Sequence, residues 1–217
     1  MRTAPISLAL RLVTAALMFW AIVWQVTDRV VNNVFRPTEY FEYFTIETGL
    51  ISATVTLLGA IRILQKTKDT VRWLNTRLAV VSYEIVVGII YNLLLRDDKP
   101  DPRDGSYAWP HLPNELLHVW APILITIDFI LSSSQIRLKL NRVWWILIFP
   151  FGWFLLMNLR GYLVDGWFPY WFFDPAKSNL TTIVEYFFGI LVFMIVVGFG
   201  MQSLRNLIDK QLGRNAR

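Results

Sequence analysis

The sequence contains no cysteine, and its 217 residues include only two histidines. The absence of cysteine excludes disulfide bonds, thiol catalysis and cysteine metal sites. The two histidines, His111 and His118, are too few and too close in sequence to supply paired axial haem ligands from facing helices. Charged residues are also scarce, at 17% of the chain. So little charge excludes an ordinary water-exposed surface.

Hydrophobic residues are correspondingly abundant. They make up 55% of the chain, aromatic residues make up 15%, and the mean hydropathy is +0.43. A helix needs about 20 apolar residues to cross a membrane core about 30 Å thick. Apolar runs bounded by charge or proline occupy residues 8–27, 43–63, 76–95, 114–133, 143–161 and 181–203. These runs are too long for strands and do not alternate, so they predict an all-α, polytopic membrane protein with six helices in one bundle, formed as a single domain by residues 1–217.

The first apolar run also has features of a signal peptide, because Arg2 and Arg11 stand at its start. No small-residue cleavage site follows, however, and Trp20, Trp24 and Gln25 occupy its end. We therefore expect a membrane helix there.

The distribution of charge predicts the orientation. Basic residues concentrate in the second and fourth connections and in the C-terminal tail, namely Arg62, Lys66, Lys68, Arg72, Arg77, Arg137, Lys139, Arg142, Arg205, Lys210, Arg214 and Arg217. Acidic residues concentrate in the other three connections. Because cytoplasmic loops carry an excess of Lys and Arg, both termini are expected in the cytoplasm. The net charge of +5 is thus a topology signal, and we predict no nucleic-acid partner.

Polar side chains inside the predicted helices lie at a similar depth, near the outer face of the membrane. Thr45 and Glu47 fall in the first turns of the second segment, and His118 lies about one turn into the fourth. The others lie near the outer ends of segments three, five and six, and they are Asn92, Asn158, Arg160 and Glu185. Polar groups in hydrocarbon are costly and therefore indicate a functional site.

Thr45 and His118 form the one obvious reactive pair in this layer. A threonine hydroxyl becomes a nucleophile when a base accepts its proton, and a neutral imidazole suits that role near neutral pH. Thr48 lies on the same helical face as Thr45 and could replace it. Either Glu115 or Glu185 could orient the imidazole, as a carboxylate does in a catalytic triad.

Three stretches resemble a known family. They are EYFTIETGL at residues 42–50, LLHVWAP at 116–122 and WFPYWFFD at 167–174. Their order and the six-segment layout resemble the androgen-induced-gene family of integral-membrane hydrolases and its bacterial relatives. The resemblance implies a hydrolase that cleaves fatty acid esters of hydroxy fatty acids, with Thr45 as the nucleophile and His118 as its partner. The run Glu47-Thr48-Gly49 departs from the amide or serine-type run expected in bacterial members.

A substrate of that kind would place its acyl chains among apolar side chains and its carboxylate near the interface. Arg160 could hold the carboxylate bidentately. Asn158 and Asn92 are the candidate donors to the oxyanion, and Glu185 is a further candidate contact to the substrate. The predicted mechanism uses no metal and no cofactor.

Structural roles are the alternatives for each residue. Threonine in a membrane helix usually bonds its own helix carbonyls, a histidine near a helix start can cap or bridge helices, and arginine can extend to the interface. The alternative function is a lipid- or small-molecule-binding or transport protein without chemistry. Transporters usually show paired broken helices at the midplane, whereas this polar layer is shallow. The expected location is a bacterial inner membrane, with the oligomeric state and the natural lipid left open.

Overall fold

The computed structural model describes residues 4–98, 101–132, 136 and 139–211 of the chain. Within these residues it is helical and contains no strand. Six helical segments of the described chain are long and apolar enough to cross a membrane, and they comprise Pro5–Val31, Phe44–Leu64, Val71–Leu95, His111–Leu131, Val143–Asp165 and Leu180–Gln211. The predicted all-α, multi-pass membrane fold is therefore confirmed. The predicted fourth segment ends at residue 133, which lies outside the described residues, as do Arg137, Arg214 and Arg217 of the predicted basic regions.

The spans are built from longer and shorter helical elements. The long ones are α1 (Ala4–Val31), α3 (Phe44–Leu64), α4 (Val71–Ile90), α6 (Ala121–Leu131), α7 (Ile148–Arg160) and α8 (Leu180–Gln211). The short ones are α2 (Pro37–Tyr40), η1 (Tyr91–Leu95), η2 (Pro102–Asp104), α5 (His111–Glu115), η3 (Leu116–Trp120), η4 (Leu140–Leu147), η5 (Gly161–Asp165) and η6 (Trp171–Phe173).

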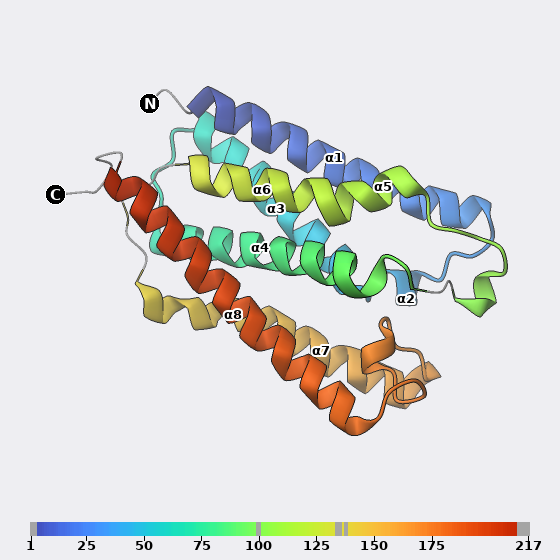
Figure 1. Cartoon of the computed structure of the whole chain (residues 1–217). Helices are drawn as coiled ribbons and strands as arrows, with labels where there is room; N and C mark the ends of the chain where they lie inside the picture. The colour runs from blue at the N-terminus through green and yellow to red at the C-terminus, as the bar shows by residue number, and fades with distance from the viewer. Residues whose placement is uncertain (1–3, 99–100, 133–135, 137–138, 212–217) are drawn as a thin grey trace.

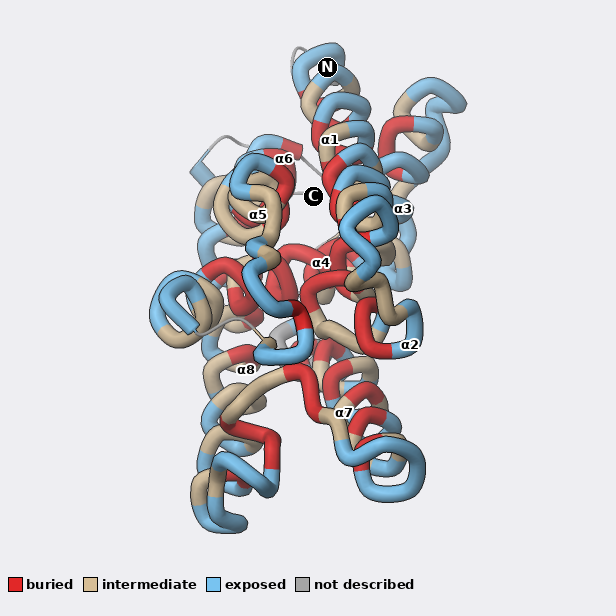
Figure 2. Tube along the Cα trace, turned by 90° about the vertical axis from the view of Figure 1, so that its right-hand side faces the viewer, coloured by how far each residue is buried: buried red, intermediate tan, exposed pale blue. Residues whose placement is uncertain are grey.

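The long helices run between the same two ends of the bundle, and α1 begins at the end where α8 finishes (Figure 1). We call this the terminal end of the bundle and the opposite one the distal end. Helices α1, α3 and α6 lie on one side of α4, whereas α7 and α8 lie on the other (Figures 1 and 2). That both termini lie in the cytoplasm stays a prediction.

Helix α4 lies in the middle of the bundle. It is the most buried of the six spans and α8 is the least (Figure 2). Helix α4 packs closely against the fourth span at Gly88. A Cβ added there would lie 3.1 Å from the His118 carbonyl oxygen and 3.2 Å from Pro122. The fourth span, which carries His118, therefore packs against the distal half of α4.

An ionic cluster holds the helices together near the terminal end. Arg11 of α1 donates to both carboxylate oxygens of Asp128 on α6, each at 2.9 Å, and to the Gly59 carbonyl of α3, also at 2.9 Å. Arg77 of α4 donates to the same carboxylate at 2.8 Å and to Ser132. These side chains are buried, so the single carboxylate of Asp128 compensates two cations away from water.

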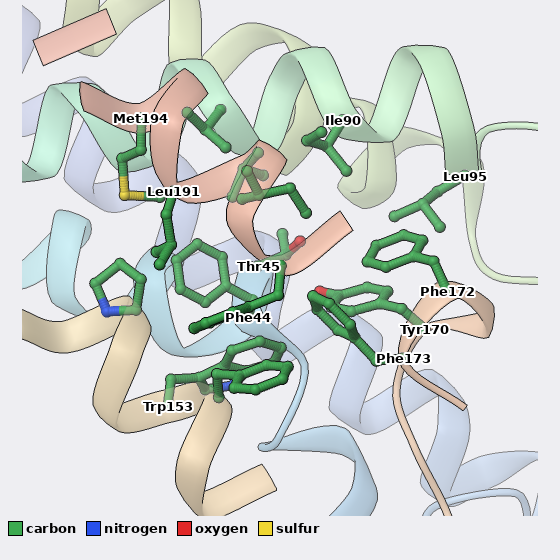
Figure 3. A pocket seen from close by; sticks show the side chains of 16 residues that line it. Phe44, Thr45, Ile90, Leu95, Trp153, Tyr170, Phe172, Phe173, Leu191 and Met194 are labelled. Atoms are coloured by element: carbon green, nitrogen blue, oxygen red, sulfur yellow. The ribbon is translucent and has the colours of Figure 1, made fainter. Parts of the chain in front are cut away.

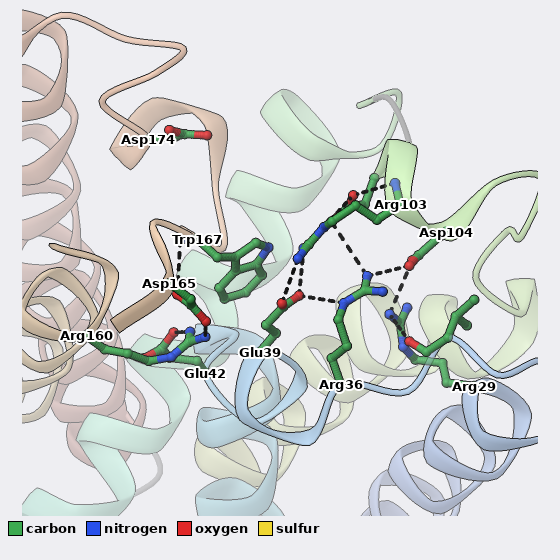
Figure 4. Close-up of polar contacts among 12 residues, drawn as sticks. Arg29, Arg36, Glu39, Glu42, Arg103, Asp104, Arg160, Asp165, Trp167 and Asp174 are labelled. Carbon is green, nitrogen blue, oxygen red and sulfur yellow. Dashed lines mark hydrogen bonds and ion pairs between the residues drawn. The ribbon is translucent and has the colours of Figure 1, made fainter. Parts of the chain in front are cut away.

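The distal end is closed by a second, larger ionic network (Figure 4). Arg103 forms a bidentate pair with Glu39, with both N–O distances at 2.8 Å, and also bonds Asp101. Arg36 joins Glu39 to Asp104, and Asp104 in turn accepts from Arg29 of α1 at 3.2 Å. The network ties the connection after α1 to the one after η1.

Candidate functional site

An apolar cavity lies between α3, α4, α7 and α8 in the distal half of the bundle (Figure 3). Its cavity volume is about 60 Å³, and it is lined mainly by aromatic and aliphatic side chains. The lining comprises Phe44, Thr45, Val86, Val87, Ile90, Leu95, Pro150, Trp153, Phe154, Tyr170, Phe172, Phe173, Phe187, Ile190, Leu191 and Met194. Thr45 and Tyr170 supply the hydroxyl groups of this wall. A pocket that is mostly apolar with few polar groups is the usual form of a small-molecule site.

Thr45 reaches this wall because it stands in the first turn of α3. The helix begins at Phe44, after Tyr43 in an extended conformation, and no side chain caps it. The Tyr43 carbonyl accepts from the backbone N–H groups of Ile46 at 2.9 Å and Glu47 at 3.1 Å. The amides of Phe44 and Thr45 precede these and have no carbonyl partner within the helix.

The hydroxyl of Thr45 is not used by its own helix. Thr48, one turn further, donates to the Phe44 carbonyl at 2.7 Å, which is the ordinary structural role of a membrane threonine. Within the described residues no such bond to a helix carbonyl forms from Thr45. Thr45 is 9% exposed, so its hydroxyl is buried and faces the cavity. Of the two candidate threonines, Thr45 is the one that can act on a ligand there.

Tyr170 faces Thr45 across the cavity wall (Figure 3). The Thr45 hydroxyl and the backbone amides of Phe44 and Thr45 are donors that act to lower the pKa of Tyr170. Burial raises the pKa of Tyr170 to about 12, and these donors partly offset that effect. An aromatic run before a helix is typical of an interfacial belt, so the sequence carried no signal for this position of Tyr170.

His118 lies beside the cavity, on η3, and not in its lining. Its Nδ1 lies 2.9 Å from the Asn114 carbonyl oxygen, and its ring stacks on Tyr91 with centroids 3.8 Å apart. Since a carbonyl only accepts, Nδ1 donates and Nε2 is the acceptor of the neutral ring. No hydrogen bond joins His118 to Thr45 in the described part of the chain. Ile90, which precedes Tyr91 in the chain, lines the cavity.

Unusual helical geometry surrounds His118. Both Tyr91 and His118 lie in π-helical turns, η1 and η3, and a third such turn, η5, ends the fifth span. Such turns widen a helix by one residue and occur often at functional sites. Hydropathy carries no signal for them.

Neither acid proposed to orient His118 contacts its ring. Glu115 instead pairs with Arg96, at 2.7 and 3.2 Å, and Glu185 is exposed on α8. The partner of Nδ1 is the backbone carbonyl of Asn114, four residues earlier in the same helical segment.

The two asparagines predicted as oxyanion donors bond their own helices. Asn92 donates to the Gly88 carbonyl at 2.7 Å and accepts from Arg96, while Asn158 donates to the Phe154 carbonyl at 2.8 Å. Neither lines the cavity. The structure therefore does not bring them together with Thr45.

Arg160 is already paired. Its guanidinium contacts Glu42 and Asp165 and lies over the Trp167 ring, 5.2 Å from the centroid (Figure 4). Burial raises the pKa of the Glu42 carboxyl, and the bond from Arg160 opposes this shift. Two carboxylates neutralise the cation, so Arg160 joins α7 to the segment before α3 at the distal rim. Among the described residues no three His, Asp or Glu side chains form a group that could hold a metal ion.

A helical bundle with six apolar spans and a buried, hydroxyl-bearing apolar cavity defines a multi-pass α-helical membrane protein with a site suited to an apolar ligand. Comparison of the chain with protein-family models, curated proteins and solved structures gives no match in any of the three.

Proposed function

We propose that this protein is a membrane-embedded lipid hydrolase that cleaves fatty acid esters of hydroxy fatty acids, with Thr45 as the nucleophile and His118 as its base. The observation that carries the proposal is the position of Thr45. Its hydroxyl is buried at the wall of an apolar cavity and forms no bond to its own helix within the described residues. The resemblance of residues 42–50 and 116–122 to the androgen-induced-gene hydrolases supports the same two residues.

The cavity favours a lipid over a polar substrate. Seven of the sixteen lining residues are aromatic, and Phe154 and Phe187 stack at 3.9 Å between centroids. Burying acyl chains among such rings contributes roughly 25 cal/mol for each Å² of apolar surface. A polar substrate would lose its hydration without gaining partners.

The proposed reaction proceeds through an acyl-enzyme. The Thr45 oxygen attacks the ester carbonyl, its proton passes to Nε2 of His118, and the hydroxy fatty acid leaves with that proton. Water then releases the fatty acid with His118 again as the base. Proton transfer requires about 3 Å between the two groups, and we propose that substrate binding brings them together through the η1 and η3 turns.

Arg160 receives no substrate role in this proposal. A substrate carboxylate could reach its guanidinium only by displacing Glu42 or Asp165. We propose instead that Arg160 stabilises the rim above the cavity. A bacterial inner membrane is the proposed location, supported by the compact chain and the resemblance to bacterial members.

The test is hydrolysis of a palmitate ester of hydroxystearate by purified protein in detergent. We expect activity in wild type, loss of about 1,000-fold or more in Thr45→Ala, by analogy with nucleophile removal elsewhere, and a comparable loss in His118→Ala. Thr48→Ala is the matched control, because its hydroxyl bonds the Phe44 carbonyl, and it should keep activity within about threefold. Full activity in Thr45→Ala would refute the assigned nucleophile.

The same cavity also favours lipid binding without chemistry. In that case wild type would bind the ester with no turnover, and Thr45→Ala would bind it equally well. Following a radiolabelled ester through both binding and product formation separates the two functions in one experiment.

A further inference from the structure

Tyr170 belongs to the segment between η5 and α8, residues 166–179, which folds back onto the bundle. Its ring is fixed by other rings: it stacks on Phe172 at 5.3 Å and meets Tyr43 at 5.9 Å and Trp153 at 6.0 Å, measured between centroids. Trp153 is itself anchored, since its indole nitrogen donates to the Glu42 carbonyl at 2.9 Å. The hydroxyl of Tyr170 is thus held at a defined place in the cavity wall.

That place is the N-terminal end of α3. The Tyr170 side chain lies beside Thr45 in the cavity wall (Figure 3). This is the start of α3, where no carbonyl of the helix satisfies the amides of Phe44 and Thr45. The N-terminal end of a helix also carries partial positive charge, which favours a developing anion.

Tyr170 keeps that proton at physiological pH. Burial raises its pKa to about 12, so the phenol is neutral and is a hydrogen-bond donor throughout the neutral range. The asparagines that the sequence offered for this role are bonded to the carbonyls of Gly88 and Phe154 and lie outside the lining. Tyr170 is therefore the side-chain donor that the structure places beside the nucleophile.

We propose that the Tyr170 hydroxyl stabilises the oxyanion that forms when Thr45 attacks the ester. In this step the Thr45 oxygen bonds to the carbonyl carbon, the carbonyl π electrons move to its oxygen, and the Thr45 proton passes to the base. The new oxyanion accepts the hydrogen bond from Tyr170. When the carbonyl re-forms, the ester bond breaks and the departing alkoxide takes the proton from the base. This inference rests on the proposed hydrolase function.

The test compares Tyr170→Phe with wild type in the ester assay. The substitution keeps the ring and its stacking, so folding should be preserved, and equal melting temperatures check this. We expect kcat to fall about 100-fold or more, as when a single oxyanion donor is removed elsewhere, with KM within about threefold. Covalent labelling by a lipophilic fluorophosphonate should slow in parallel, because phosphonylation develops charge on the same kind of oxygen.

Tyr186→Phe is the matched control. Tyr186 stacks on Phe172 at 4.9 Å in the same aromatic group but lies outside the cavity lining, so the same chemical change there should leave kcat unchanged. Wild-type activity with kcat retained in Tyr170→Phe would overturn the role of Tyr170 and leave the hydrolase intact. Absence of both hydrolysis and labelling in wild type would overturn the hydrolase and this inference together.

Discussion

At the scale of single residues, the threonines of the helices show what sets Thr45 apart. Thr27, Thr48 and Thr76 each donate to the carbonyl four residues earlier, at 2.7 to 3.1 Å. Thr45 stands in the first turn of α3, where the carbonyl four residues earlier belongs to Phe41, before the helix. Its hydroxyl is consequently available to the cavity. The first-turn position of Thr45 therefore removes the usual structural partner of its hydroxyl.

Asp101 at the distal end provides a pH-dependent test of the ionic network. Hydrogen bonds from Arg103 lower the pKa of its carboxyl from 3.8 to about 2. The depressed pKa means that Asp101 contributes stability above pH 3.8 and loses it as the pH falls toward about 2. We expect Asp101→Asn to melt below wild type at pH 5, with the difference shrinking at pH 3, as followed by tryptophan fluorescence.

The exposed neighbour Asp97 is the control for this prediction. Asp97→Asn removes one negative charge from a nearby position, as Asp101→Asn does. Its melting temperature should match that of wild type at both pH values. A deficit of Asp101→Asn that stays constant from pH 5 to pH 3 would show that the pairing with Arg103 does not set the titration.

The sequence predicted Thr45 and His118 as a pair but did not predict their surroundings. Short motifs carried both residues, and the cavity lining includes the first of them. Tyr170 was missed because an aromatic run before a helix resembles an interfacial belt. The pairing of Arg160 was missed because Glu42 is 118 positions away in sequence, and hydropathy contains no information on such partners.

At the scale of elements, the helices were predictable and their irregularities were not. Apolar runs bounded by charge located all six spans of the described chain, to within a few residues at most ends. The π-helical turns η1, η3 and η5 were not foreseen, because they depend on how neighbouring helices pack. His118 faces Tyr91 through two of these turns, so the site geometry depends on the least predictable elements.

Two glycines of α8 test the packing of that helix. A Cβ added at Gly198 would lie 2.7 Å from the Ile146 side chain and 2.9 Å from that of Val143. We expect Gly198→Ala to destabilise the protein by about 1–3 kcal/mol through overpacking. A Cβ at Gly200 meets nothing within 4 Å, so Gly200→Ala should be neutral or slightly stabilising. Thermal unfolding in detergent measures both, and equal melting temperatures would contradict the packing of α8 against η4.

At the scale of the whole molecule, charge is concentrated at the two ends of the bundle. The terminal-end cluster joins α1, α4 and α6 through Asp128, while the distal network joins the connecting segments (Figure 4). Between these ends lies a mostly apolar core in which α4 contacts helices on both sides. The cavity occupies the distal half, beneath the rim that Arg160 and Glu42 form.

Removing the charge of Asp128 should weaken the assembly of the bundle. Asp128→Asn leaves Arg11 and Arg77 buried with one carboxylate fewer, which costs about 3–5 kcal/mol in comparable cases. Asp165→Asn breaks a more exposed pair and should cost about 1 kcal/mol or less. Unfolding in increasing sodium dodecyl sulfate, followed by tryptophan fluorescence, compares the two. Equal midpoints would show that the terminal-end cluster does not hold the helices together.

The absence of cysteine allows a direct test of orientation. Lys66 lies in the connection after α3 and Ser106 in the one before α5, and both are exposed. We expect a membrane-impermeant maleimide to label Ser106→Cys in intact cells and Lys66→Cys only after permeabilisation. The reverse pattern would invert the predicted orientation and leave the fold unchanged.

The most direct test of the central claim is to locate the site of covalent modification in the wild-type protein. A lipophilic fluorophosphonate, followed by proteolysis and mass spectrometry, reports which side chain attacks it. The account predicts a phosphonyl group on the peptide that contains Thr45, absent from Thr45→Ala and present in Thr48→Ala. Modification of another residue, with Thr45 unmodified while the ester is hydrolysed, would contradict it.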